Sequence, residues 1–364
     1  MQLADIVAVL ESIAPTRFAE SWDNVGLLAG DPAQQVSRAM LTIDYTADVA
    51  AEAQRLNCEL VIAYHPPIFE ALKRLTSGSL VFDTIRRGIA VYSPHTALDF
   101  ADGGTNDMLA DAVGMTPQRD ALRLAQPKTQ QYKLVVFAPP DAAEKVSEAI
   151  FQAGAGRIGN YSSCSFQNPG KGTFFGDENT NPAVGKKGTL ERTDEIRIET
   201  VLALEKVEPV IKALRAAHPY EEPAFDLLQL AVPAEGKGMG RIGSLVEPQD
   251  VSAVIDRLKQ ELSLKHLLVA GPKDRRVYRA AVCAGACGNL LDDAIGQKAD
   301  LYITGEMRHH DAIKASKAGV TVLCTLHSNS ERAVLPRLLG KLSAMTDGVQ
   351  FHISSADRDP FQVV

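Results

Sequence analysis

The feature that most constrains the fold is an unbroken apolar stretch that ends abruptly at a histidine. Residues 60–64 read Leu-Val-Ile-Ala-Tyr, His65 follows, and Pro66 and Pro67 come next. A short apolar run bounded by turn residues is typical of a strand buried on both faces of a sheet. Because proline cannot donate to a sheet ladder, the strand must end at His65. Ligands bind beyond the carboxyl ends of strands in open α/β sheets, so His65 is a candidate site residue.

Length, charge and composition exclude several classes of protein. A chain of 364 residues is too long for one ordinary core, which favours two or three domains. The net charge of −7, with no basic run of five residues, argues against nucleic-acid binding through phosphates. No apolar run approaches the roughly 20 residues that span a bilayer. An acidic N-terminus and five scattered cysteines argue against export and a disulfide scaffold. The sequence therefore predicts a cytoplasmic protein without nucleic-acid or membrane partners.

The order of predicted strands and helices changes twice along the chain. Residues 1–125 and 241–364 alternate strands with helices, which predicts two α/β halves with parallel-rich sheets that close on each other as one domain. Residues 126–240 instead follow the order β-α-β-β-α-β, typical of a ferredoxin-like α+β unit. The predicted architecture is therefore one α/β domain interrupted by a ferredoxin-like insert.

Histidine and carboxylate side chains, which are common metal ligands, follow several of the predicted strands. They are His65, His95 with Asp99, Glu306, and His327 with Glu331. Imidazoles and carboxylates without thiolates suit zinc, iron or manganese. Two metal ions bridged by a carboxylate could hold a hydroxide nucleophile near neutral pH. Because the pattern recurs at strand ends, these residues are predicted to form one metal-binding site.

Each segment also has a purely structural interpretation. A lone histidine after a strand, such as His95, is more often structural than a ligand, and Asp99 could simply turn the chain. Ser328 and Glu331 match a capping box, which would start a helix without any chemistry. Glu306 could act as an acid/base or orient a ligand. On the helix that follows Glu306, the adjacent residues His309 and His310 could face the site or solvent.

Five motifs occur in one order along the chain: Trp22-Asp-Asn-Val-Gly-Leu-Leu, Tyr64-His-Pro-Pro-Ile-Phe, His95-Thr-Ala-Leu-Asp-x-x-x-Gly-Gly-x-Asn-Asp107, Thr304-Gly-Glu306-x-x-His-His310 and His327-x-x-x-Glu331-Arg332. Together they resemble the motifs of the Ngg-interacting-factor-three-like family. Its bacterial members are described as dinuclear-metal-centre hexameric proteins and type 2 homologues of GTP cyclohydrolase I. Two segments between these motifs, Gly159-Asn-Tyr-Ser-Ser-Cys-Ser-Phe166 and His218-Pro-Tyr-Glu-Glu-Pro-Ala224, look like the family's optional insert, which is similar to PII and CutA modules.

The resemblance implies two divalent metal ions per chain, zinc, iron or manganese, at a shared site. It implies ligands at His65, Asp99, His327 and Glu331, with His95 lining or joining the site. It also implies a homo-oligomer, a toroidal hexamer built as a trimer of dimers, with the metal sites facing an inner cavity.

The chain departs from the family pattern at Tyr64. Many members have a second histidine at the position of Tyr64, directly before the residue that matches His65. Tyr64 could ligate weakly as a phenolate, hydrogen-bond a metal-bound water, or leave His95 to supply the ligand to the second metal. The occupancy of that second site therefore depends on Tyr64.

These patterns together predict a metal-dependent hydrolase that acts on a nucleotide or another phosphorylated small molecule. Glu306 or His95 would move protons. The alternative is a non-catalytic metal carrier or a ring that senses a small ligand through its inserts.

Overall fold

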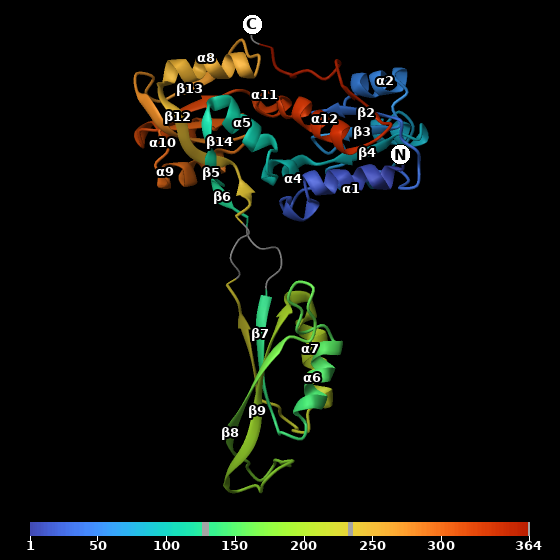
Figure 1. Cartoon of the computed structure of the whole chain (residues 1–364), viewed down its shortest axis with the longest axis vertical. Helices are drawn as coiled ribbons and strands as arrows, with labels where there is room; N and C mark the ends of the chain where they lie inside the picture. The colour runs from blue at the N-terminus through green and yellow to red at the C-terminus, as the bar shows by residue number, and fades with distance from the viewer. Residues whose placement is uncertain (126–130, 232–235, 363–364) are drawn as a thin grey trace. The chain divides into compact units, whose positions relative to one another are not determined.

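The computed structural model describes residues 1–125, 131–231 and 236–362 of the chain (Figure 1). The chain forms two compact units: Met1–Ala125 together with Glu235–Val364, and Gln126–Ala234. The first unit is the predicted mixed α/β part and the second is the predicted α+β insert. Among the described residues, the helices are too short or too polar to cross a membrane.

The first unit contains a five-stranded sheet with the strand order β1-β4-β3-β2-β17. Strands β17, β2, β3 and β4 run parallel, and β1 pairs antiparallel with β4. The strands are β1 (Gly26–Ala29), β2 (Arg38–Thr42), β3 (Leu60–Ala63), β4 (Ala90–Ser93) and β17 (Gln350–Ile353). The helices along this part of the chain are α1 (Leu3–Ile13), α2 (Ala47–Arg55), α3 (Leu80–Arg86) and α4 (His95–Phe100). Every residue of β3 is buried, as the apolar run predicts.

A second sheet of six strands has the order β13-β16-β15-β14-β12-β5, and its inner strands β14, β15 and β16 run parallel. These strands are β5 (Met115–Asp120), β12 (Arg241–Asp250), β13 (Leu268–Ala270), β14 (Arg276–Cys283), β15 (Leu301–Thr304) and β16 (Thr321–Cys324). Its helices are α5 (Thr105–Val113), α8 (Val251–Glu261), α9 (Leu291–Gly296), α10 (His309–Lys317), α11 (His327–Arg332) and α12 (Val334–Met345). Two short strands, β6 (Arg123–Leu124) and β11 (Gly238–Met239), form a separate ladder.

The two halves of this unit exchange their edge strands. Strand β5 comes from the first half of the chain but extends the second sheet, and β17 comes from the end of the chain but extends the first. One apolar core joins both sheets, with Leu41 and Ile62 from the first and Val282 and Ile303 from the second. Since burial of this core is the main stabilising term, the two halves stabilise each other as a single unit.

The second unit has the element order and sheet of a ferredoxin-like fold, which confirms the prediction for the insert. Its elements are β7 (Gln131–Ala138), α6 (Ala143–Gln152), β8 (Ser165–Phe175), β9 (Leu190–Ala203), α7 (Val207–Ala217) and β10 (Phe225–Gln229). They form the antiparallel order β10-β7-β9-β8. Helices α6 and α7 bury Val146, Ile150, Val210 and Leu214 in one core with the sheet. Strands β8 and β9 are the longest of this unit and pair antiparallel along the whole of β8.

A buried carboxylate on α2 fixes the segment that follows β17. Glu52 accepts hydrogen bonds from the hydroxyls of Ser354 and Ser355, at 2.6 and 2.5 Å, and from the amides of Ser355 and Ala356, at 3.0 and 3.1 Å. Burial alone would raise the pKa of Glu52, but these hydrogen bonds outweigh it and lower the pKa to about 2. The segment after β17 is therefore held in place by one ionised side chain.

The substitution Glu52→Gln is expected to lower the free energy of unfolding by about 2–3 kcal/mol at pH 7. Because the pKa is lowered on folding, this stabilisation is complete above the ordinary value of 4.5 and is lost as the pH falls from there to about 2. Urea unfolding of both proteins between pH 7 and pH 3 measures the difference, which should shrink with acid. Glu247→Gln, at an exposed carboxylate, is the control and should change little at any pH.

Candidate metal centre

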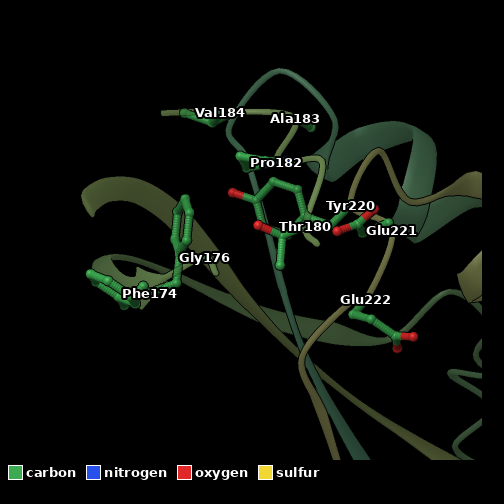
Figure 2. Close-up of a pocket in the computed structure, with 10 residues that line it drawn as sticks. Phe174, Gly176, Thr180, Pro182, Ala183, Val184, Tyr220, Glu221 and Glu222 are labelled. Carbon is green, nitrogen blue, oxygen red and sulfur yellow. The ribbon is translucent and has the colours of Figure 1, made fainter. Parts of the chain in front are cut away.

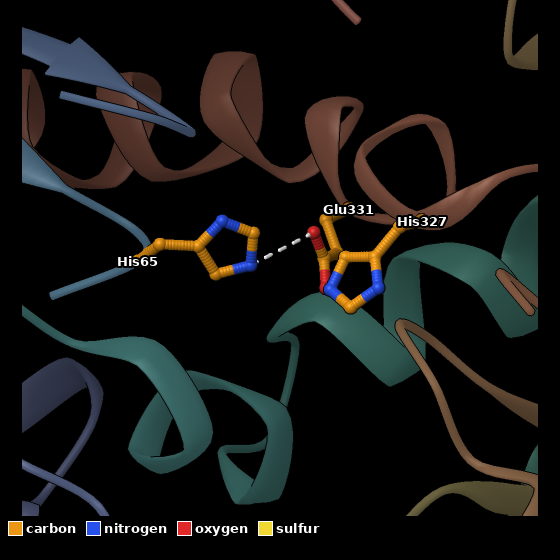
Figure 3. Close-up of side chains that lie close together, drawn as sticks. All are labelled: His65, His327 and Glu331. Carbon is orange, nitrogen blue, oxygen red and sulfur yellow. Dashed lines mark ion pairs between the residues drawn. The ribbon is translucent and has the colours of Figure 1, made fainter. Parts of the chain in front are cut away.

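Three side chains from distant parts of the chain bring possible metal ligands together. One atom each from His65, His327 and Glu331 lies within 4.8 Å of the other two. The Glu331 carboxylate lies between the two imidazoles: Oε2 is 3.3 Å from His65 Nε2, and Oε1 is 3.4 Å from His327 Nε2. Figure 3 shows the two rings flanking this carboxylate. A carboxylate in this position can bind a cation together with either imidazole.

The sheets explain why these residues meet. His65 follows β3 of the first sheet, and His327 follows β16 of the second. The amide of His65 donates to Ile43 O at 3.0 Å, which carries the ladder two residues beyond β3 before Pro66 ends it. Glu331 lies one turn after His327 on α11 and its side chain is 4% exposed. The carboxyl ends of strands from two sheets therefore face a common point.

The backbone beside His327 is unusually constrained. Leu326 has a φ of +71°, a backbone conformation that residues other than glycine rarely adopt. Gly285, in the turn after β14, has a φ of +75°, and a Cβ there would lie 2.9 Å from Glu331 Oε1. The absence of a side chain at Gly285 therefore keeps room beside the bridging carboxylate.

Carboxylates also bind the far side of both imidazoles. Asp44 Oδ1 is 2.9 Å from His65 Nδ1, and Glu306 Oε1 is 3.2 Å from His327 Nδ1. A carboxylate on Nδ1 fixes the ring and its tautomer, so that Nε2 is the nitrogen offered to a metal. Both Nε2 atoms face Glu331, so these three side chains form a candidate metal-binding group whose rings are already oriented.

The hydrogen bonding and electrostatics fit a cation. His65 Nε2 and Glu331 Oε2 are buried and, among the described residues, lack a hydrogen-bond partner, although they lie 3.3 Å apart. Burial would lower the pKa of His65, but Asp44 and Glu331 outweigh it and raise the pKa to about 10. Between these carboxylates the ring carries a proton in the metal-free protein. A divalent ion bound in place of that proton would likewise offset the negative charge of the buried carboxylate.

A second group of predicted residues lies directly beside the first. The ring centroid of His95 is 5.3 Å from that of His65 and 5.7 Å from that of Tyr64. Asp23 Oδ1 lies 2.7 Å from His95 Nδ1, so this imidazole is oriented in the same way as the other two. The Tyr64 hydroxyl donates to Asp99 Oδ1 in a short hydrogen bond. His95, Asp99 and Tyr64 thus border the triad without belonging to its tightly clustered ligand atoms.

Burial shapes the titration of this second group. It raises the pKa of Asp99 to about 7, against the lowering effects of the Tyr64 hydrogen bond and the charge of His95. Burial, with the charges of Asp99 and Glu331, also raises the pKa of Tyr64 well above its usual value. In the metal-free protein the phenol therefore stays protonated, and its hydroxyl donates a hydrogen bond to Asp99.

One expectation from the sequence is corrected here. Ser328 does not form a capping box with Glu331: helix α11 begins at His327, no side chain caps it, and the Ser328 hydroxyl donates to Asp359 Oδ2 at 3.1 Å. Strand β4 leads directly into the short helix α4, which begins at His95. This helix places His95 and Asp99 on successive turns.

His309 and His310 begin helix α10 and are both exposed. Their ring centroids lie 5.4 Å apart. Among the residues that the structure describes, neither belongs to the triad of candidate ligands.

Asp23 and Asp44 are the residues that the sequence did not single out as parts of the site. Asp44 lies just after β2, and Asp23 belongs to the motif around Trp22. An aspartate in a turn is common, so neither position by itself indicates a site. Only the three-dimensional pairing with an Nδ1 atom reveals their role.

Cavities of different character occur in the two units. One of about 680 Å³ in the first unit is lined by Glu306, Arg308 and Asn289, which precede α10 and α9, and by residues of these two helices such as Asp311. Since Glu306 also contacts His327, this cavity adjoins the candidate metal centre. Another, of about 220 Å³, lies within the second unit between Phe174 and Tyr220 (Figure 2) and contains none of the predicted site residues.

Comparison with known proteins covers nearly the whole chain. Residues 1–360 match the family model described as Duf34/NIF3 (NGG1p interacting factor 3). The chain is 37% identical over 339 residues to a Mycobacterium tuberculosis protein named GTP cyclohydrolase 1 type 2 homolog, covering 91% of this chain and 88% of that protein. It is 33% identical to the Bacillus subtilis protein of the same name, covering 98% and 97%.

Solved structures resemble this chain along its whole sequence. A Bacillus cereus protein related to NIF3 has 35% identity and a TM-score of 0.65, with coverage of 100% of this chain and 99% of that one. A Staphylococcus aureus protein with 24% identity has a TM-score of 0.74 at the same coverage, a likeness that concerns the fold alone.

Proposed function

The chain belongs to the Duf34/NIF3 family, and from this premise we propose that it is a metal-dependent hydrolase of a nucleotide or another phosphorylated small molecule. The observation that carries the proposal is the Glu331 carboxylate lying between two imidazoles whose Nδ1 atoms are held by other carboxylates. A cation bound there would replace the proton that His65 carries in the metal-free protein, and its ligands would already be oriented.

We propose two divalent ions, zinc, iron or manganese. His65, His327 and Glu331 would hold the first, and Asp99 with His95 would hold the second beside Glu331, with Tyr64 as a weaker contributor. When bound, such ions polarise the scissile group and lower the pKa of water. His95, whose Nδ1 is held by Asp23, and the Asp99 carboxylate, which accepts from Tyr64, are the groups beside the triad that would supply these ligands.

The residues around the ions have distinct roles in this proposal. Glu306 holds His327 through Oε1 while its side chain stays 48% exposed, so it can also move a proton to or from a substrate in the adjoining cavity. His95, fixed by Asp23, is the second group placed to move a proton.

Metal analysis and hydrolysis assays with purified full-length protein test the proposal. Expected results are one to two metal ions per chain and release of phosphate or an opened ring from at least one nucleotide or sugar phosphate. Glu306→Gln should still bind metal, with an affinity at most about 100-fold lower because His327 is held less firmly, and should lose most of the hydrolysis, about 10²- to 10⁴-fold. Bound metal without hydrolysis of any substrate by the unaltered protein would instead support the metal carrier or the ligand-sensing ring.

We also propose a homo-oligomer, a hexamer, that works in the cytoplasm. All five cysteines are free thiols, which supports a reducing compartment. Sedimentation analysis of the purified protein tests the hexamer.

A further inference from the structure

Two large aromatic side chains beside the metal centre are left half outside the protein. Trp22 is 58% exposed and Phe69 is 50% exposed. Their ring centroids lie 6.1 Å apart at an angle of 52°. Apolar rings gain free energy from burial, so two of them held together in water mark a surface that receives something else.

These rings are held in place by the same contacts that build the site. Asp23, next to Trp22, binds His95 Nδ1 through one oxygen and the amide and hydroxyl of Thr96 through the other. The side chain of Asn24 donates to Ile68 O at 2.5 Å, which ties the Trp22 turn to the turn that carries Phe69. The aromatic pair is therefore a fixed feature of the fold.

Trp22 of this pair also lies beside His95, one of the proposed metal ligands. The centroid of Trp22 is 6.0 Å from that of His95, with the two planes nearly perpendicular. The His95 centroid in turn lies 5.3 Å from that of His65. A group bound against the indole would therefore be separated from the proposed metal ligand His65 only by the His95 ring. This position favours a part of the substrate as the bound group.

We propose that Trp22 and Phe69 form the subsite for a planar heterocyclic ring of the substrate. The inference rests on the proposed function and narrows its substrate class from phosphorylated small molecules in general to those with such a ring, as in nucleotides. Aromatic side chains bind bases by stacking, which is tolerant of base identity because every base has a π-face.

Trp22 is the only tryptophan in the chain, so its fluorescence reports on this subsite directly. Full-length protein is titrated with AMP or GMP and, separately, with ribose 5-phosphate, which has the phosphate and sugar but no base. Saturable quenching is expected with the nucleotides, and binding of ribose 5-phosphate should be at least 10-fold weaker. Equal affinity for both kinds of ligand would overturn the proposal.

Variants identify the rings that are responsible, with affinity measured by calorimetry. Trp22→Ala and Phe69→Ala should each weaken nucleotide binding by about 5- to 100-fold, whereas Trp22→Phe should retain most of it. Tyr278→Ala removes a similarly exposed ring on β14 and should change nothing. Unchanged nucleotide affinity in Trp22→Ala would refute the subsite. If that variant dissociated the oligomer while nucleotide affinity stayed unchanged, the rings would be an interface between copies.

The outcome is separable from that of the proposed hydrolase. Ring-dependent binding without turnover supports the subsite and contradicts the hydrolase. Turnover of ribose 5-phosphate at the rate of a nucleotide supports the hydrolase and contradicts the subsite.

Discussion

Replacing Glu331 with glutamine is expected to remove bound metal from the protein and to abolish hydrolysis. Its carboxylate faces the Nε2 atoms of both His65 and His327, so no other side chain replaces it at that point. A neutral amide can offer one oxygen to a cation, but it removes the negative charge and places an NH2 group against one imidazole. Metal affinity should fall by at least about 100-fold, more than for loss of an outer carboxylate. Competition with a chelator measures the change.

Glu52→Gln is the matched control for this experiment, since it also neutralises a buried carboxylate. That variant should lose stability and keep its metal, whereas Glu331→Gln should lose its metal. If Glu331→Gln bound metal as tightly as the unaltered protein, the bridging role of Glu331 would be wrong.

Gly285→Ala is the second substitution with a large expected effect. The added Cβ would lie 2.9 Å from Glu331 Oε1 and 3.6 Å from His327 Nε2, so the carboxylate or the turn must move. The φ of +75° adds strain for any side chain. The variant is expected to lose about 1–2 kcal/mol of stability from the backbone alone and most of its metal affinity from the crowding.

Gly319→Ala separates these two causes. Gly319 has a φ of +76°, but a Cβ there would meet no atom within 4 Å. It should therefore show the same loss in thermal unfolding and leave metal binding unchanged. Equal metal affinities for the two variants would show that the space beside Glu331 is not needed by a metal.

The parts of the fold that could be predicted from the sequence depend on local patterns. The apolar run before His65 fixes β3, because burial on both faces needs side chains without polar atoms. Thr46 predicts the start of α2, where its side chain accepts from the amide of Val49 at 3.4 Å. The ferredoxin-like order likewise follows from the alternation of elements within the insert.

Pairings between distant segments could not be predicted in the same way. The exchange of β5 and β17 between the sheets produces no local sequence pattern, because an edge strand has the same kind of sequence in either sheet. The site shows the same limit. The residue types of His65, His327 and Glu331 suggested a metal, but only the fold shows that Asp44 and Asp23 hold Nδ1 atoms.

The position of β17 has a consequence for synthesis of the protein on the ribosome. Ile43, just beyond β2, bonds with Asp357, which lies 314 positions further along the chain. Until that late segment emerges, the outer border of β2 has its backbone groups open to water and to other nascent chains. The insert, whose partners are close in sequence, needs no such wait. The first sheet is therefore complete only after β17 has been translated, and the candidate metal centre, which includes His327 and Glu331, also forms late.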